Sequence, residues 1–496
     1  MTVEQVLAGV ALRSAVPEAL RTSTVSALEY DSRRSVPGSL FFAFPGAKAD
    51  GREFARVAVE QGAIAVLSEL PAPAGFAGPW IQVEHGRKAL AQSARNFYGA
   101  PDARLGITAI TGTNGKTTTA FLTDAILRHA GCVTAILGTI EYRLGPTVLP
   151  AVNTTPESLD LYRIFVEMLE IGGTHVTMEV SSHALALGRV YGVNFRTAVF
   201  TNLTRDHLDF HLTMDAYFAA KQLLFTPEGA PPPLWAVLNH DDAYGRRVQP
   251  APETQVIRYG FDEGADLRAV DMRTDVHKDF DGLHFCIEHA GERIPIASPM
   301  LGRINVYNIL AACGAALSYG LDWKTIQEGI AACPAVPGRF ERVDAGQPFL
   351  VVVDYAHTDD ALRNAIAVAR GLNPKRVITL FGCGGDRDRS KRPLMGAAAA
   401  EASDFVVLTS DNPRSEDPLG IMNDAMVGLR RFDTPHLAEP DREKAIRAAL
   451  CQAAPGDIVI LAGKGHEPYQ VLKDRTIAFD DRKIAREILR GMGYKK

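Results

Sequence analysis

The chain has 496 residues, more than one hydrophobic core usually supports, so we expect two to four domains. Its 46% hydrophobic and 22% charged residues are typical of a globular protein, and no segment approaches the ~18 consecutive apolar residues of a membrane span. A formal net charge of −5 excludes a general attraction to nucleic acid or to an anionic membrane. Six scattered cysteines without a C-x-x-C pair, and no signal peptide, predict reduced thiols and a cytoplasmic location.

Residues 1–102 predict a first α/β unit. We expect strands at 39–44, 63–67 and 80–83, and helices at 53–62 and 86–98. Asp31, Ser32 and Arg33 lie in a loop before the first of these strands. A polar turn of this kind is more often solvated than functional, so these residues alone favour a solvated turn.

A second unit, 103–337, begins with the apolar strand 105–110, the segment T-G-T-N-G-K-T-T-T at 111–119, and a helix at 120–129. Glycines in a strand-to-helix turn let backbone N–H groups face a phosphate at the helix N-terminus. Lys116 would then reach the β- and γ-phosphates, and the Thr117 hydroxyl would hold Mg²⁺. Ile110 replaces the usual first glycine, so an ordinary turn with a surface lysine is the alternative, but the flanking strand and helix favour phosphate binding.

Two later strands of this unit, 174–180 and 197–202, end in polar residues. Because ligands bind at the carboxyl ends of parallel strands, Glu179, His207 and Thr117 are predicted to converge on one metal-phosphate site. Oxygen ligands suit Mg²⁺, whereas a lone histidine is more often structural. Lys221 lies on a short apolar helix, where spacing alone favours an exposed lysine.

The segment 333–338 contains two prolines and predicts a hinge before a third unit, 338–496. There we expect strands at 349–353, 376–381, 405–408 and 458–462, each followed by a polar loop. Four such loops at one edge of a parallel sheet predict a binding face.

Eight motifs occur in order: D-S-R-x-x-x-P-G-x-L-F-F-A at residue 31, T-G-T-N-G-K-T-T, M-E-V-S-S-H, T-N-L-T-R-D-H-L-D-F-H, A-A-K-x-L-L-F, G-C-G-G-D-R-D, D-N-P-R and G-K-G-H-E. Together they resemble the Mur ligases of bacterial cell-wall synthesis, and most closely the members that add 2,6-diaminopimelate. The resemblance implies three α/β domains: a UDP-binding N-terminal domain, a central P-loop ATPase domain with a mostly parallel sheet, and a C-terminal Rossmann-like domain. It also implies a monomer that joins meso-diaminopimelate to UDP-MurNAc-L-Ala-D-Glu with ATP, through an acyl phosphate, in peptidoglycan precursor synthesis.

The resemblance also implies roles for individual residues. The catalytic residues would be Lys116, Lys221, Glu179 and His207. Two Mg²⁺ ions are expected, one on Thr117 and Glu179, the other on His207 and on a CO₂-derived carbamate of Lys221. The ATP-contacting positions would be Gly112, Thr113, Asn114, Gly115, Lys116, Thr117, Thr118, Asn305, Asn308 and Arg339.

Three further groups of residues would hold the other substrates. The UDP positions are Ser32, Ala47, Lys48 and Ala49, and the muramyl-peptide positions are Asn153, Thr154, Thr155, Ser181 and Arg189. Leu187 departs from the family, in which many members have Gln, so one polar substrate contact is not expected here. The amino-acid positions are Arg387, Asp411, Asn412, Pro413, Arg414, Gly463 and Glu467.

Chemistry supports the amino-acid assignment, because diaminopimelate differs from lysine by an extra carboxylate beside its distal ammonium. Arg414 can make two parallel bonds to that carboxylate, and Asp411, Asn412 and Glu467 can accept from ammonium groups. Arg387 would take the other carboxylate, and His357 is a candidate for deprotonating the attacking amine.

Two alternatives stay open at this point. A ligase like folylpolyglutamate synthase shares the central and C-terminal design, but the motif at 31–51 and the full N-terminal unit argue against it. An ATP-binding regulator without chemistry is the other, and intact Lys116, Glu179, His207 and Lys221 argue against that.

Overall fold

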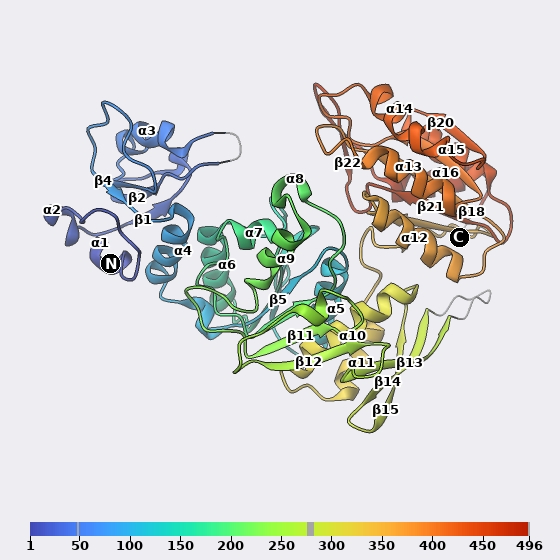
Figure 1. The fold of residues 1–496 in the computed structure, drawn as a ribbon, viewed down its shortest axis with the longest axis horizontal. Helices are drawn as coiled ribbons and strands as arrows, with labels where there is room; N and C mark the ends of the chain where they lie inside the picture. The colour runs from blue at the N-terminus through green and yellow to red at the C-terminus, as the bar shows by residue number, and fades with distance from the viewer. Residues whose placement is uncertain (47–48, 275–281, 495–496) are drawn as a thin grey trace.

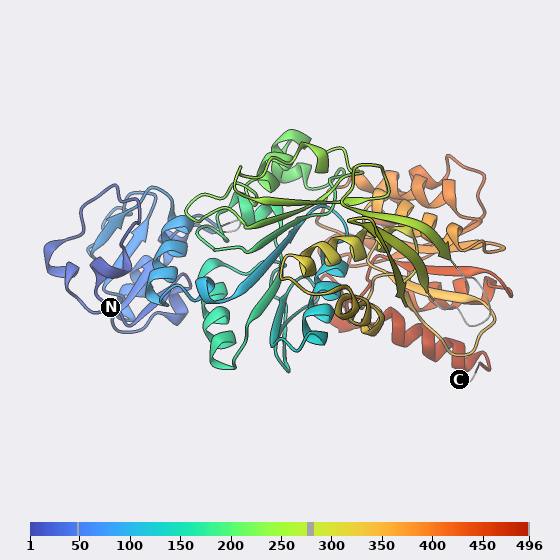
Figure 2. The same cartoon turned by 90° about the horizontal axis from the view of Figure 1, so that it is seen from below.

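A computed structural model describes residues 1–46, 49–274 and 282–494. The chain forms three lobes that follow one another in sequence order, each built around its own sheet (Figures 1 and 2). The mixed α/β class expected from the sequence is confirmed. The predicted domain limits, 1–102, 103–337 and 338–496, stay predictions, although each sheet falls within one of these ranges.

The first lobe has a four-stranded parallel sheet in the order β1-β2-β3-β4. Strands β2 and β3 are buried at every position, as continuous apolar runs in a parallel sheet should be. The predicted helix at 53–62 is instead a 3₁₀ turn followed by a shorter helix. The elements are α1 Val3–Val6, α2 Glu18–Arg21, β1 Ala27–Glu29, η1 Ser32–Arg34, β2 Ser39–Phe42, η2 Gly51–Phe54, α3 Ala55–Glu60, β3 Ala65–Ser68, β4 Trp80–Gln82 and α4 Gly86–Phe97.

The central lobe has an eleven-stranded sheet in the order β15-β14-β13-β12-β11-β10-β5-β9-β6-β7-β8. Its middle strands are parallel, and antiparallel strands extend both edges. The elements are η3 Pro101–Arg104, β5 Gly106–Thr111, α5 Lys116–His129, β6 Thr134–Leu137, β7 Glu141–Leu144, β8 Thr147–Pro150, α6 Ser158–Glu170, β9 His175–Glu179, α7 Ser182–Ala186, β10 Thr197–Phe200, α8 Leu208–His211, α9 Met214–Gln222, β11 Trp235–Asn239, η4 Gly245–Arg247, β12 Gln255–Gly260, β13 Leu267–Thr274, β14 Leu283–His289, β15 Glu292–Ser298, α10 Arg303–Leu317 and α11 Trp323–Ala332.

The third lobe has a six-stranded sheet in the order β16-β17-β21-β18-β19-β20. The four predicted strands are present and parallel, so their polar loops share one edge, as expected. The elements are β16 Glu341–Arg342, β17 Leu350–Asp354, α12 Asp359–Gly371, β18 Val377–Cys383, α13 Lys391–Ala402, β19 Phe405–Ser410, α14 Pro418–Leu429, β20 His436–Glu439, α15 Arg442–Gln452, β21 Ile458–Ala462, β22 Tyr469–Val471, β23 Thr476–Ala478 and α16 Asp481–Gly491.

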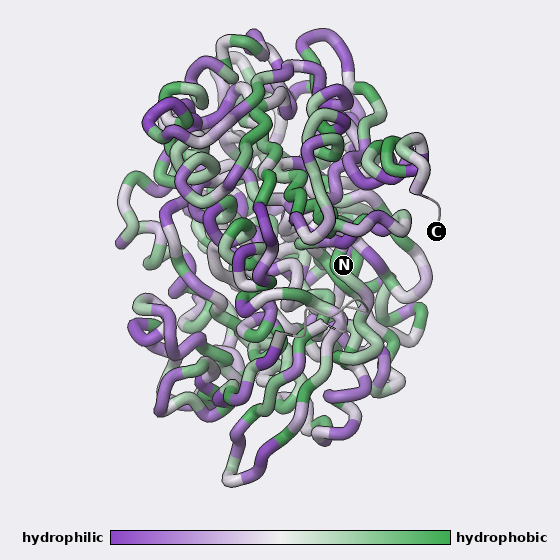
Figure 3. Tube along the Cα trace, turned by 90° about the vertical axis from the view of Figure 1, so that its right-hand side faces the viewer, coloured by the Kyte–Doolittle hydropathy of each residue, from purple (hydrophilic) through white to green (hydrophobic). Residues whose placement is uncertain are grey.

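The cores lie on both faces of the sheets. One apolar cluster runs from the first lobe into the central lobe, where α4 packs against α6. A second cluster covers the other face of the central sheet beneath α10 and α11, and two more flank the C-terminal sheet. Figure 3 shows hydrophobic segments running through the interior, with many hydrophilic loops around them. Among the described residues, no helix is both long and apolar enough to cross a membrane.

Candidate active site

The loop after β5 has the shape expected of a phosphate cradle. Gly115 caps α5 with φ +87°, and the helix begins at Lys116, four residues earlier than the sequence pattern predicted. A Cβ on Gly112 would lie 1.9 Å from Thr201 Oγ1, and one on Gly115 would lie 2.4 Å from Asn308 Oδ1. Only glycine fits at these two positions, because other residues would clash and would disfavour the left-handed backbone.

The end of β10 fixes this loop in place. Asn202 Oδ1 accepts from the Asn114 backbone N–H at 3.0 Å, and Thr201 Oγ1 donates to the Asn114 carbonyl at 2.6 Å. Lys116 Nζ donates to the carbonyls of Gly112 and Thr113 at 2.9 and 2.8 Å. The ammonium group is therefore already held over the loop that would carry the phosphates.

Strand order explains why the other predicted groups meet this loop. Strand β5 lies between β9 and β10, so the residues that follow these three strands lie side by side. Glu179 at the end of β9 is 1% exposed, and its carboxylate accepts from the Thr139 N–H at 2.9 Å and its hydroxyl at 3.1 Å. His207 follows β10 in a left-handed conformation, φ +53°.

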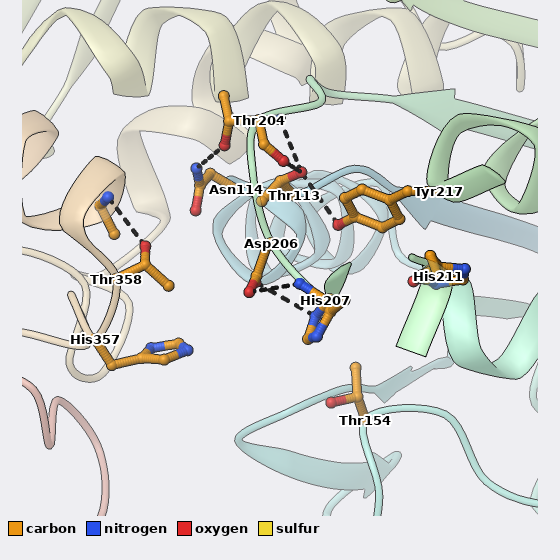
Figure 4. A network of polar contacts seen from close by, with 12 residues as sticks. Thr113, Asn114, Thr154, Thr204, Asp206, His207, His211, Tyr217, His357 and Thr358 are labelled. Atoms are coloured by element: carbon orange, nitrogen blue, oxygen red, sulfur yellow. Dashed lines mark hydrogen bonds and ion pairs between the residues drawn. The ribbon is translucent and has the colours of Figure 1, made fainter. Parts of the chain in front are cut away.

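Asp206 orients His207. Its carboxylate accepts from the His207 backbone N–H at 2.9 Å and lies 3.4 Å from Nε2, as Figure 4 shows. Burial lowers the pKa of His207 to about 4, although Asp206 opposes this shift. The imidazole is therefore neutral near pH 7, which is the form that binds a metal.

Lys221 is buried, so the exposed lysine favoured by its spacing is wrong. Its side chain is 1% exposed, and Nζ donates to the Gly112 carbonyl at 2.9 Å. Burial, followed by the neighbouring Lys116, holds the pKa of Lys221 well below its usual value. The ammonium group lies 4.8 Å from the centre of the Tyr217 ring, and none of the described carboxylates forms an ion pair with it.

These groups surround a cavity of about 320 Å³ between the central and C-terminal lobes. From the C-terminal side, Arg339 Nη2 donates to Thr117 Oγ1 at 3.1 Å, and His357 faces Asp206 and His207 across the space (Figure 4). The predicted residues that line it are Gly112, Thr113, Asn114, Gly115, Lys116, Thr117, Thr118, Thr154, Glu179, Ser181, His207, Lys221, Asn305, Asn308, Arg339 and His357.

The remaining muramyl-peptide positions lie beside this cavity. Thr155 Oγ1 donates to the Glu179 carbonyl at 2.9 Å, and Arg189 Nη1 donates to the Thr155 carbonyl at 3.1 Å. The Asn153 carbonyl accepts from the Tyr142 hydroxyl. Leu187 is the C-terminal cap of α7 and has no polar side chain. Two residues later, the charged Arg189 pairs with Glu157 at 3.0 Å.

The predicted UDP positions lie apart from the cavity, in the first lobe. Ser32 starts η1 and is buried, so the solvated turn expected from these residues alone is wrong at this position. The Ala49 carbonyl accepts from the Gly46 N–H at 2.9 Å. Ala47 and Lys48 lie outside the described residues.

The predicted amino-acid positions form a second polar cluster at the carboxyl edge of the C-terminal sheet. Asn412 Nδ2 donates to Glu467 Oε2 at 2.8 Å, and Arg414, with φ +52°, donates from Nη1 to the Gly385 carbonyl at 2.7 Å. Asp411, Pro413 and Gly463 are buried around them, whereas Arg387 is exposed. Among the described residues, no side-chain hydrogen bond of Arg414 uses Nε or Nη2, so both are left for a further acceptor.

Comparison with known proteins places this geometry in a family. Residues 24–98 match the catalytic domain of the Mur ligase family, residues 110–316 the Mur ligase middle domain, and residues 338–465 the Mur ligase glutamate ligase domain. A UDP-N-acetylmuramoyl-L-alanyl-D-glutamate–2,6-diaminopimelate ligase of Solibacter usitatus is 66% identical over 494 residues, covering 100% of this chain and 99% of the relative. This chain belongs to the Mur ligase family.

Further members support the same placement. The ligase of that name from Geobacillus thermodenitrificans is 47% identical and covers 93% of this chain and 94% of its own. A solved structure of a diaminopimelate ligase of this name superposes with a TM-score of 0.71 at 32% identity, covering 100% of both chains. Because these matches include the first lobe, they disfavour the folylpolyglutamate-synthase alternative, which the sequence motif at 31–51 already argued against.

Several residues of this Mur ligase site were not predicted from the sequence. Asn202 and Thr201 hold the loop, Thr139 supports Glu179, and Asp206 orients His207 and accepts from Lys391 at 2.6 Å. Asn202 and Asp206 lie within the motif T-N-L-T-R-D-H. The motif contributed to the family resemblance, but no function was predicted from it for these two residues. Among the described residues, no group of three or more His, Cys, Asp or Glu side chains could hold a metal; the predicted ligands instead mix carboxylate, hydroxyl, imidazole and lysine.

Proposed function

We propose that this Mur ligase joins meso-diaminopimelate to UDP-MurNAc-L-Ala-D-Glu with hydrolysis of ATP to ADP and phosphate. The observation that carries the proposal is the single cavity in which Lys116, Glu179 and Lys221 face Arg339 and His357 from the next lobe. The relatives named for this reaction match the whole chain and support the choice of substrates. The cytoplasmic location and the monomeric state remain predictions.

The reaction has two balanced steps. An oxygen of the D-glutamate carboxylate forms a bond to the γ-phosphorus, and the bond from that phosphorus to the bridging oxygen breaks, which gives an acyl phosphate and ADP. The amine nitrogen then forms a bond to the acyl carbon, loses a proton, and phosphate leaves. Lys116 neutralises the transferred phosphoryl group. Most of the remaining rate enhancement comes from holding the reacting groups in position.

The residues present fit two Mg²⁺ ions, which when bound would neutralise phosphate and carboxylate oxygens that otherwise repel one another. Glu179 and Thr117 offer oxygen ligands at one end of the cavity. His207 is neutral, and Lys221 is a buried amine whose lowered pKa favours the form that adds CO₂. We therefore retain the carbamate on Lys221 as part of the proposal.

The amino-acid assignment rests on the cluster around Arg414. Arg414 Nε and Nη2 would bind the distal carboxylate of diaminopimelate, and Glu467 and Asp411 would accept from its ammonium. Lysine would leave Arg414 Nε and Nη2 without an acceptor, and unpaired sites of this kind discriminate by factors of roughly ten thousand.

The test is ADP release with purified enzyme. We expect it to require UDP-MurNAc-L-Ala-D-Glu and meso-diaminopimelate, with very little turnover when L-lysine replaces the latter. Arg414→Ala should sharply raise the KM for diaminopimelate, whereas the exposed Arg431→Ala should leave it unchanged. ADP release without the muramyl substrate would refute the proposed ligase activity. Comparable kcat/KM values for meso-diaminopimelate and L-lysine would refute diaminopimelate as the preferred amino acid.

A further inference from the structure

Lys464 is a fully buried cation behind the amino-acid cluster. Its side chain is 0% exposed, although it lies two residues after the end of β21, in the loop G-K-G-H-E. Lysine is almost never buried to this extent unless acceptors surround its ammonium group, because the charged form loses its hydration. Glu467, three residues later, is proposed to bind the amino acid, whereas Lys464 has no role in the reaction described so far.

Three groups from two loops surround the Lys464 ammonium. Nζ donates to Asn412 Oδ1 at 3.0 Å and lies 3.5 Å from Glu467 Oε2 and 3.7 Å from Asp411 Oδ1. Tyr469 covers the group, with its ring centre 5.9 Å from Nζ. Two of these acceptors, Asp411 and Glu467, are the side chains that are proposed to receive the ammonium of the amino acid.

Lys464 also sets the orientation of the Asn412 amide. Asn412 Oδ1 accepts from both Lys464 Nζ and the Val471 backbone N–H, at 3.0 and 2.9 Å, so the amide NH₂ must point the other way. There Nδ2 donates to Glu467 Oε2 at 2.8 Å. Glu467 therefore has one oxygen held by Asn412, and among the described residues no hydrogen bond reaches Oε1, which is left for a ligand.

Packing brings these loops together across the end of β18, since β21 and β19 are its two neighbours in the sheet. Gly463 permits the approach: it has φ +114°, and a Cβ there would lie 2.6 Å from Asp411 Oδ2. The cluster is thus built with one cation between two carboxylates. Its remaining net charge of −1 and the +1 of Arg414 together complement an ammonium beside a carboxylate.

We propose that Lys464 is a positioning residue for amino-acid recognition: it holds Asp411 directly, and Glu467 directly and through Asn412, as a preformed pair of acceptors for the substrate ammonium. This inference rests on the proposed function. Without the cation, the two carboxylates repel each other and Asn412 Oδ1 keeps only the Val471 N–H as its donor, so the acceptor set is held less firmly. Lys464 itself would touch no substrate atom, and its effect would pass through Asn412 and Glu467.

The test is Lys464→Met, which replaces the aliphatic part of the side chain and removes the ammonium group, with exposed Lys473→Met as the matched control. We expect K464M to raise the KM for meso-diaminopimelate by about tenfold or more. The KM values for ATP and UDP-MurNAc-L-Ala-D-Glu, and kcat at saturating amino acid, should stay within about twofold, because these groups bind elsewhere. A uniform loss across all substrates, or an unchanged KM for diaminopimelate, would overturn the inference.

A double-mutant cycle keeps the test decisive if K464M is poorly folded. In K464M/E467Q one of the two carboxylates is also neutralised, which restores the net charge of −1 that the cluster has in the wild type, so this variant should fold. If Lys464 acts through Glu467, the double variant should raise the KM for diaminopimelate no further than E467Q alone. Multiplicative effects of the two substitutions would contradict the proposal. Wild-type enzyme that does not use meso-diaminopimelate at all would instead refute the proposed function, so the two failures are distinguishable.

Discussion

Lys116 is positioned before any phosphate arrives. Its ammonium donates to two carbonyls of its own loop, Gly112 and Thr113. These two hydrogen bonds hold the ammonium group within the phosphate cradle. Such a preorganised charge needs little rearrangement when negative charge builds up on the transferred phosphoryl group. Lys221 lies on the other side of Gly112 and donates to the same carbonyl, at 2.9 Å.

The first prediction concerns that charge. Lys116→Ala should reduce ligation by on the order of a hundredfold or more, because the β- and γ-phosphates lose their fixed counter-charge. The measurement is ADP release with all three substrates at saturation, with exposed Lys324→Ala as the control. Near-normal turnover in a folded K116A enzyme would show that the loop is not a phosphate cradle.

Lys221 gives the second prediction, because the group needed there is an anion rather than an ammonium. Lys221→Ala should be nearly inactive, and added acetate should partly restore its activity by supplying a short carboxylate in the space that the side chain leaves. ADP release with and without acetate measures this, and chloride at equal ionic strength is the control. Full activity of K221A without any addition would rule out the carbamate; absence of rescue alone would weaken it.

At the scale of elements, the strand-loop-helix unit at β5 could be predicted because its signals are local: an apolar run, glycines at fixed offsets and a helical pattern. The ends of β9 and β10 followed from the parallel-sheet rule, which predicted that Glu179 and His207 would lie near Thr117; all three line the cavity, and their shared metal-phosphate role stays a prediction. The burial of Lys221 could not be predicted, since α9 presents it to Gly112, 109 residues away in sequence. The start of α5 was also missed, because the Gly115 cap overrides the weak helical pattern of the threonines.

The connection between the central and C-terminal lobes depends on a glycine. Gly338 lies in the predicted hinge, between α11 and β16, with φ +65°, and a Cβ there would lie 2.1 Å from the His466 backbone nitrogen. The segment is therefore packed tightly against the G-K-G-H-E loop. A movement of the hinge segment 333–338 would therefore also move the loop that carries Glu467.

We expect Gly338→Ala to destabilise the protein by about 2 kcal/mol or more, because the new methyl group cannot be accommodated without moving one of two backbones. Gly371→Ala is the matched control: it lies at the end of α12 with nothing within 4 Å of its Cβ position, and should be neutral or slightly stabilising. Urea-unfolding midpoints measure both. Equal stability of the two variants would contradict the close packing at 338.

At the scale of the whole molecule, the C-terminal lobe contacts the phosphate loop directly. Asp360, in the first turn of α12, accepts from Asn114 Nδ2 and from Thr204 Oγ1, both at 2.9 Å. Lys391, at the start of α13, donates to Asp206 at 2.6 Å. Two helices of one lobe thus bind the loop and the histidine-bearing segment of the other, so the position of the C-terminal lobe and the geometry of the cradle are linked.

This linkage gives the last prediction. Each hydrogen bond or partly buried ion pair of this kind contributes about 0.5–1.5 kcal/mol, so removing all three contacts in Asp360→Ala/Lys391→Ala should favour separated lobes by roughly ten- to a thousandfold. Small-angle scattering should show a larger radius of gyration, and kcat should fall, because the cavity needs residues from both lobes. The control is Arg363→Ala/Glu401→Ala, which removes an ion pair between α12 and α13 within one lobe and should change neither quantity. If the first variant kept the native radius and rate, these contacts would not determine how the lobes dock, and packing around the 333–338 segment would have to do so.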